Sequence, residues 1–175
     1  CLEGSDHPSA RAFPNARAGR HLAVYDPSTD EMTLIGTCYS THHLIFAEDD
    51  DNTLWTSGGG QVIGWFNTKL FLETGDEELA QGWSVQVLDT NGNGRRDEYV
   101  EPGEPMDAAK DTRIERGFYG VAPSPLDGSI WGSSTGFPGG VVRFVPGDDP
   151  VNTGLTEFYE VPWNDGDASV QGFSP

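Results

Sequence analysis

Short apolar runs separated by turns of Gly, Asp, Asn and Pro follow one another along most of the chain. Runs of this length, rich in β-branched and aromatic residues, predict β-strands joined by tight turns. Helix is nearly absent from the pattern. One short helical turn is predicted at residues 76–81, where Asp76 is a suitable N-cap. The pattern therefore predicts an all-β fold.

An internal repeat organises these strands. Residues 43–57 align with residues 119–133 without a gap, each with an apolar strand, an acidic turn and a strand that ends in Trp and small residues. A third strand (62–67 against 141–146) and a fourth follow in each copy. Four short strands form a small sheet that cannot bury both of its faces alone, so neighbouring sheets must stack on it. The repeat predicts β-propeller blades of four antiparallel strands.

The repeat divides the chain into about two and a half blades of a larger propeller. We expect a half blade at about 21–37, a blade at about 42–89, an insertion at about 90–116, a blade at about 117–162 and a lead-in to the next blade at 163–175. Propellers typically have about 4–8 blades. The remaining blades are therefore expected from the same, longer chain, with a second chain as the alternative source.

Trp55 and Trp131 occupy the same position in the two copies, so both are expected to pack between blades. With the Asp127-Gly128 turn and the Asp26-Pro27 dipeptide, they make the chain resemble the streptogramin lyase-like (virginiamycin B lyase-like) propellers, which are related to the NHL-repeat group. The resemblance covers most of residues 21–162 outside the insertion. In that family the reaction opens a cyclic peptide antibiotic by elimination, with magnesium and a histidine near the channel. One fold supports many functions, so the resemblance implies the architecture and does not transfer the activity.

The chain is strongly acidic, with 28 acidic residues against 10 basic residues and a net charge of −18. Phosphate backbones and anionic lipid would repel it, which argues against nucleic-acid binding. The acid excess fits either solubility in a harsh or salty medium or the binding of hard cations such as calcium. No run of about 18 apolar residues exists, so no membrane span is expected. Cys1 and Cys38 are either a disulfide of an oxidising compartment or two unrelated thiols.

The most specific motif is a calcium-type loop at residues 89–97, which read D-x-N-x-N-G-x-x-D like the start of an EF-hand or dockerin loop. Oxygens at positions 1, 3, 5 and 9 would surround the cation, and Gly94 permits the sharp turn. Position 12 is Val100, so Glu98 or Glu101 would have to supply the last carboxylate. The candidate metal ligands are Asp89, Asn91, Asn93, Arg95 (through its carbonyl), Asp97, Glu98 and Glu101. The alternative is a solvated Asn-Gly turn; a bound calcium would be structural and would hold the insertion against the propeller.

His42 and His43 are the candidate catalytic residues. They stand at the start of the innermost strand of a blade, which lines the central channel, where a histidine can be a general base or a metal ligand. Adjacent residues of a strand point to opposite faces, so at most one is expected to face a given site. The next blade has residues 118–119, Phe-Tyr, at these positions, so the blade itself does not require histidine. The acidic run at residues 49–51 is expected to be a solvated turn, with a second cation site as the alternative.

These features predict a secreted or periplasmic, calcium-stabilised β-propeller that binds or scaffolds an unidentified small-molecule or protein ligand. The alternative is a metal-dependent lyase or hydrolase that resembles the streptogramin lyases and uses channel histidines. Magnesium is the cofactor which that resemblance implies.

Overall fold

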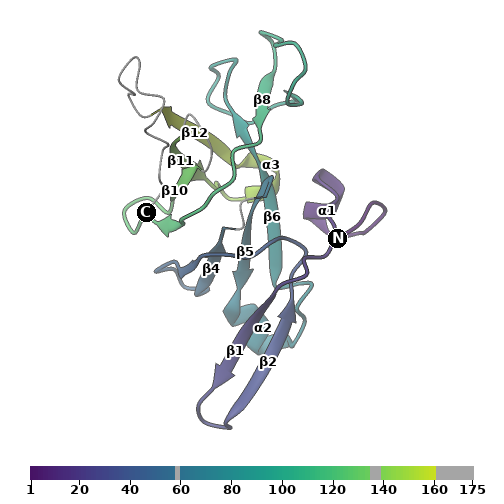
Figure 1. Ribbon diagram of the computed structural model, residues 1–175, viewed down its shortest axis with the longest axis vertical. Helices are drawn as coiled ribbons and strands as arrows, with labels where there is room; N and C mark the ends of the chain where they lie inside the picture. Colours follow the sequence, from purple (N-terminus) through teal and green to yellow (C-terminus); the bar gives the residue numbers. More distant parts are fainter. Residues whose placement is uncertain (58–59, 135–138, 161–175) are drawn as a thin grey trace.

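The computed structural model describes residues 1–57, 60–134 and 139–160 (Figure 1). The expected lead-in at 163–175 and the end of the last predicted blade lie outside these residues. The described chain is mostly β, which confirms the all-β prediction. Three short helices accompany the strands: α1 (Pro8–Ala12), α2 (Thr68–Thr74) and α3 (Pro150–Thr153).

Two antiparallel meanders of four strands form the body of the fold, and a hairpin lies beside the first. The hairpin consists of β1 (His21–Asp26) and β2 (Glu31–Gly36). The first meander is β3 (Leu44–Phe46), β4 (Thr53–Thr56), β5 (Val62–Asn67) and β6 (Gln81–Leu88). The second is β9 (Ala122–Pro123), β10 (Ile130–Ser134), β11 (Gly140–Val145) and β12 (Leu155–Glu160). β12 pairs in parallel with β6 at Thr156 and Leu88, so the two meanders are joined edge to edge and belong to one ten-stranded sheet among the described residues.

The strand pairing supports the repeat and corrects its third strand by one residue. Leu54 lies opposite Phe66 and Ile130 lies opposite Phe144, so Phe66 corresponds to Phe144 and the aligned segments are 62–67 and 140–145. Both Phe side chains are fully buried. Burial of the aromatic ring selects this register, because a slip by one residue would turn the ring to the opposite face.

The turns of the two repeats also correspond. Asn52 and Gly128, which the repeat aligns, both adopt the left-handed backbone conformation, with φ of 48° and 69°. Asn and Gly are the residues that tolerate this conformation most readily. The same backbone geometry thus closes the turn between the first two strands of each meander.

Two consecutive residues of β4 pack against different parts of the fold. Leu54 belongs to a buried cluster with Leu22 and Ile35 of the hairpin. Trp55 belongs to a second cluster with Val142 and Phe144 of the second meander, and its ring centroid lies 6.1 Å from that of Phe144. The hairpin, the first meander and the second meander are therefore stacked in that order, and the first meander is covered on both faces.

Trp131 does not have the environment that the repeat predicts. Trp55 is 6% exposed, as expected of a residue between two sheets, but Trp131 is 36% exposed. Its ring stacks on Tyr159 at 5.8 Å, and the Arg143 guanidinium lies over it at 5.6 Å. The physical reason is that no further sheet covers this face of the second meander within the described ranges.

The insertion contains two strands that the sequence pattern did not indicate, β7 (Tyr99–Val100) and β8 (Asp111–Ile114). β8 pairs antiparallel with the end of β6, with Gln86 opposite Ile114 and Leu88 opposite Thr112. β6 extends beyond its pairing with β5, which ends at Val85. The free end of β6 provides the hydrogen-bonding edge on which the insertion folds.

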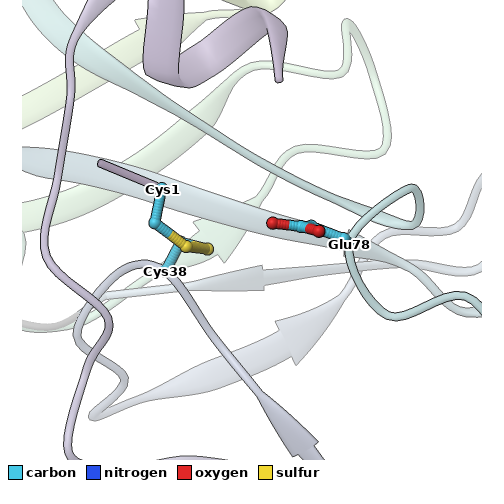
Figure 2. A group of neighbouring side chains, drawn as sticks. All are labelled: Cys1, Cys38 and Glu78. Carbon is cyan, nitrogen blue, oxygen red and sulfur yellow. A yellow bond between two sulfur atoms is a disulfide. The ribbon is translucent and has the colours of Figure 1, made fainter. Parts of the chain in front are cut away.

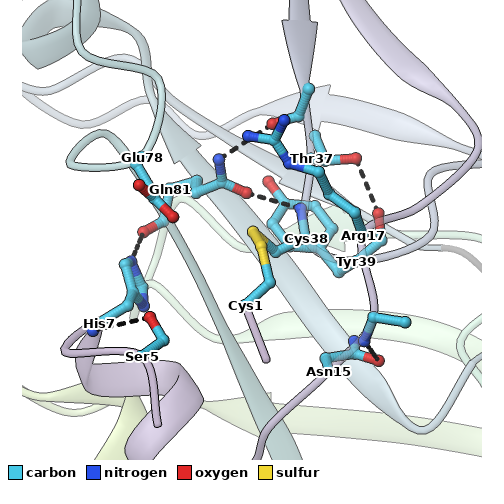
Figure 3. Close-up of a disulfide and its surroundings, with 12 residues drawn as sticks. Cys1, Ser5, His7, Asn15, Arg17, Thr37, Cys38, Tyr39, Glu78 and Gln81 are labelled. Carbon is cyan, nitrogen blue, oxygen red and sulfur yellow. Dashed lines mark hydrogen bonds between the residues drawn. A yellow bond between two sulfur atoms is a disulfide. The ribbon is translucent and has the colours of Figure 1, made fainter. Parts of the chain in front are cut away.

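The N-terminal segment is attached to this body by a disulfide between Cys1 and Cys38, whose Cα atoms lie 5.4 Å apart (Figure 3). Gln81 supports the bond, because its side-chain oxygen accepts from the Cys38 amide at 2.8 Å and its carbonyl contacts His7 Nε2 at 2.9 Å. The His7 ring stacks on Trp83 at 4.8 Å. A chain segment without strands is thereby held on β6.

The helix of this region lies earlier in the chain than the sequence predicted. Helix α2 precedes the segment predicted at 76–81. Asp76 nevertheless caps a single turn, since its carboxylate accepts from the amides of Glu78 and Leu79, both at 2.9 Å. Gly75, in the left-handed conformation with φ of 70°, ends α2 and separates the two.

Gly64 offers a test of the packing in the first meander. An added Cβ would collide with the ring of Tyr39, which is 1% exposed and has no room to move. We expect Gly64→Ala to lower the free energy of unfolding by about 1–3 kcal/mol, as overpacking does. Gly19→Ala is the matched control, because nothing lies within 4 Å of its added Cβ. Denaturant unfolding measures both; equal stability of the two variants would contradict the packing.

Reduction tests the role of the disulfide. The bond spans a sequence separation of 37 residues, and closing such a loop in the unfolded chain stabilises the folded state by about 4 kcal/mol. We expect reductant to lower the melting temperature of the wild-type protein. The double variant Cys1→Ser/Cys38→Ser should melt at the reduced value with or without reductant. A wild-type melting temperature that reductant leaves unchanged would contradict this prediction.

Candidate functional site

The calcium-type loop begins directly after β6 and is organised around the Asp89 carboxylate. Asp89 Oδ1 accepts from the amides of Gly92 and Asn93 at 2.7 and 3.1 Å, and Oδ2 accepts from the amide of Gly94 at 2.7 Å. Gly92 and Gly94 have φ of 77° and 76°, which explains why glycine occupies both positions. The loop is therefore wound tightly about its first acidic residue.

The other candidate ligand side chains of the motif form hydrogen bonds within the same turn. Asn91 Oδ1 accepts from the Asn93 amide at 3.1 Å, and Asn93 Oδ1 accepts from the Arg95 amide at 2.9 Å. The side-chain amides of Asn91 and Asn93 both donate to Asp97 Oδ2. These bonds, with Asn93 the stronger contributor, lower the pKa of Asp97. Asp89, Asn91, Asn93 and Asp97 are thus brought together in one loop, and their role as metal ligands stays a prediction.

Glu98 and Glu101 are not directed into this cluster. Glu98 forms an ion pair with Lys110 at 3.1 Å, and Glu101 forms one with Arg113 at 2.6 Å. Each carboxylate has a cationic partner from the later part of the insertion. Neither supplies the twelfth-position ligand in this arrangement.

Asp111 is the residue of this region that sequence reasoning missed. It is fully buried, and its Oδ2 accepts from the Asp97 amide at 2.7 Å, whereas its Oδ1 has no hydrogen-bond partner. The nearby Arg96 side chain is partly buried; this desolvation lowers its pKa, while Tyr99 and the Asp111 charge oppose the effect. Asp111 ties the loop to β8. No local spacing could have revealed it, because it stands far beyond the motif.

A second group of potential ligand atoms lies at the disulfide. Among the described residues, Cys1, Cys38 and Glu78 form a group of His, Cys, Asp or Glu ligand atoms close enough to hold a metal (Figure 2). The two sulfur atoms are bonded to each other and do not titrate as thiols. A disulfide lacks the thiolate that binds metal. The loop, whose donors are oxygens, is the better candidate for a hard cation.

His42 and His43 lie together, contrary to the expectation that they face opposite sides. The chain bends at His42, and β3 begins only at Leu44, so the alternation of a strand does not apply to them. Their Nδ1 atoms are 2.8 Å apart, and His43 Nδ1 lies 2.8 Å from the carbonyl oxygen of Tyr119. Both rings contact the Tyr119 ring, at 5.0 and 4.7 Å. All three side chains are exposed or half-buried.

Tyr119 is the residue that the repeat aligns with His43, so corresponding positions of the two meanders lie side by side here. A base or metal site also needs an orienting acid or a third ligand. Neither imidazole hydrogen-bonds to a carboxylate within the described part of the chain. The lyase or hydrolase alternative stays a prediction.

Comparison with known proteins finds no matching family model, no matching curated sequence and no matching solved structure. The resemblance to streptogramin lyase-like propellers therefore also stays a prediction. Among the described residues, no helix is long and apolar enough to cross a membrane.

The Asp97 carboxyl offers a test of the loop geometry. Asn93→Ala removes the main hydrogen bond that lowers the Asp97 pKa, so the pKa should rise toward its ordinary value of about 4. In the wild-type protein, the hydrogen bonds to ionised Asp97 stabilise the folded state. This contribution is present above the ordinary pKa of an aspartate and is lost as the pH falls through the lowered pKa of Asp97. Carboxyl NMR titration in calcium-free buffer measures the change.

Asp26 is the internal control for that titration, because Ser28 lowers its pKa in the remote β1–β2 turn. The pKa of Asp26 should be the same in both proteins. An Asp97 pKa that Asn93→Ala leaves unchanged would show that the loop has another geometry.

Proposed function

We propose that the protein is an extracytoplasmic, calcium-stabilised β-propeller module that binds or scaffolds a ligand. The observation that carries the proposal is the convergence of Asp89, Asn91, Asn93 and Asp97 in one tightly wound loop between two repeated sheets. The function is one of recognition, with calcium in a structural role.

The repeated meanders support the propeller architecture. Each has four antiparallel strands with corresponding register, and the Trp55 face of the first packs against the Phe144 face of the second. Short sheets that stack through apolar faces are the building principle of propellers. The hairpin β1–β2 corresponds to the last two strands of a further blade.

One face of the second meander, which no described residue covers, supports the presence of further blades from a longer chain. Ile63 is fully buried, whereas Val141, its counterpart in β11, is 38% exposed. Trp131 differs from Trp55 in the same way. A further sheet of the same repeat would cover Val141 and Trp131 as the second meander covers Ile63 and Trp55.

Calcium is the cation that this loop fits best. Carboxylate and amide oxygens are hard ligands, and calcium accepts the irregular geometry of a flexible loop, whereas magnesium demands a near-ideal octahedron. A bound calcium would offset the repulsion between Asp89 and Asp97 and the buried charge of Asp111, whose Oδ2 already holds the Asp97 amide. The metal would thereby stabilise the junction between β6 and the insertion. Magnesium is the alternative occupant.

An oxidising compartment is supported by the Cys1–Cys38 disulfide, because such bonds persist mainly in secreted and periplasmic proteins. The net charge of −18 is compatible with an extracellular setting where millimolar calcium is available.

Calcium removal tests the proposal. A ligand present at about 100 times its Kd stabilises a protein by about 2.7 kcal/mol, which corresponds to a rise of about 5–10 °C in melting temperature for a chain of this size. We expect a chelator to lower the melting temperature by about that amount, and calcium to restore it more fully than magnesium at equal concentration.

Asp89→Ala should abolish the response to chelator, because it removes the residue that organises the loop. Glu104→Ala is the matched control: this exposed acid lies in the same insertion, and its variant should respond like the wild-type protein. The calcium proposal is rejected if the chelator has no effect on the wild-type protein, or if Asp89→Ala responds as the wild type does.

A further inference from the structure

A groove of about 420 Å³ opens between the two meanders at the end of the strands opposite His42 and His43. Trp55 and Trp65 form its aromatic part, with ring centroids 5.5 Å apart. Trp65 is held in place by Gly82, since its ring occupies the space that a Cβ at this glycine would fill. The calcium-type loop does not contribute to the groove, so binding in the groove does not depend on calcium.

The rim of the groove carries negative charge only. Its charged residues are Glu48, Asp49, Asp51 and Asp148, all exposed. Among the residues that the structure describes, no Lys, Arg or His lines it. Within the described ranges none of these four carboxylates takes part in an ion pair. A groove with an aromatic wall and an anionic rim is complementary to a cation, which gains both Coulomb and cation–π attraction there.

The second meander shows which cation this combination accepts. The repeat aligns Trp131 with Trp55 and Asp127 with Asp51, and strand register places Arg143 at the position of Trp65. The Arg143 guanidinium lies 5.6 Å from the Trp131 ring centroid and pairs with Asp127 at 2.8 Å. The protein thus fills one such site with its own arginine side chain.

The first meander has Trp55 and Asp51 at the positions of the tryptophan and the aspartate. At the position of the arginine it has Trp65. The Trp65 ring takes the place of the internal cation: it lies beside Trp55 and covers Gly82, the counterpart of Glu157, which is the second acidic partner of Arg143. A cation from outside would therefore meet the Trp65 ring at the groove. Trp55 and Trp65 have no cation over their rings among the described residues, unlike Trp131.

We propose that this groove binds an arginine side chain of a peptide or protein partner. The guanidinium lies against Trp65, whose ring contacts Trp55, and donates to the Asp51 carboxylate, with Glu48 and Asp148 at the rim. Pro123 and Pro146 belong to the walls, and their restricted backbones keep the groove open before the ligand arrives. A preformed site loses little conformational freedom on binding.

Titration with a short peptide tests the proposal. The probes are acetyl-Gly-Arg-Gly-amide and the same peptide with citrulline, which keeps the shape of arginine and removes its charge. The readout is the indole N–H signal of each tryptophan by NMR. We expect the Trp65 and Trp55 signals to shift in a saturable manner with the arginine peptide, and the Trp83 and Trp131 signals to stay in place. The citrulline peptide should cause no saturable shift.

Two variants separate this site from general attraction to an acidic protein. Asp51→Asn should raise the Kd of the arginine peptide by about threefold or more, the scale of an exposed charge pair. Glu31→Gln, which removes one charge from the remote β1–β2 hairpin, should leave the Kd unchanged once salt is at physiological strength. Melting temperatures of both variants establish that they are folded.

The proposal is overturned by unshifted Trp65 and Trp55 signals, by equal binding of the citrulline peptide, or by equal weakening of binding by Asp51→Asn and Glu31→Gln. A further probe is agmatine, which has the guanidinium of arginine without a peptide backbone. If agmatine binds more tightly than the arginine peptide, the occupant is not a peptide. None of these outcomes depends on calcium, so failure here and failure of the chelator test are distinguishable.

Discussion

The stacking of one small sheet on the next is the constraint on which this structure depends. Side chains of a strand alternate between two faces, so a sheet with Leu54 and Trp55 side by side in β4 has apolar surface on both sides. It is stable only if both faces are covered. The hairpin covers the Leu54 face and the second meander covers the Trp55 face, which fully buries Phe66 and Phe144 at corresponding positions.

The regions that carry the candidate functions lie where this regular stacking ends or is interrupted. The calcium-type loop leaves the end of β6, and the insertion it begins returns to pair with the same strand through β8. The acidic groove lies where the two meanders diverge at one end. His42 and His43 meet Tyr119 where the meanders approach at the other end. Trp131 is exposed because its face of the second meander has no neighbour among the described residues. The candidate sites therefore lie where the chain departs from the repeat.

Sequence reasoning located the strands because their apolar runs and turn residues are local signals. It also predicted that Asp89 and Asp97 lie in one loop, because the backbone of a single turn brings residues at that spacing together. It failed where the outcome depends on distant partners. The exposure of Trp131 depends on a neighbouring sheet, and the pairing of His42 with His43 depends on a bend before β3. The burial of Asp111 beside the loop depends on the return of the insertion to β6, which no short spacing in the sequence encodes.

A double-mutant cycle between Trp55 and Phe144 tests the stacking of the two sheets most directly. Each single change to Leu keeps the site apolar and removes one ring, and the cycle isolates what the two rings contribute together. The account predicts a coupling free energy of about 0.5–1.5 kcal/mol, the range of an aromatic pair in contact. Unfolding free energies that add within about 0.3 kcal/mol would contradict it, because they would mean that the first and second meanders do not meet through these rings.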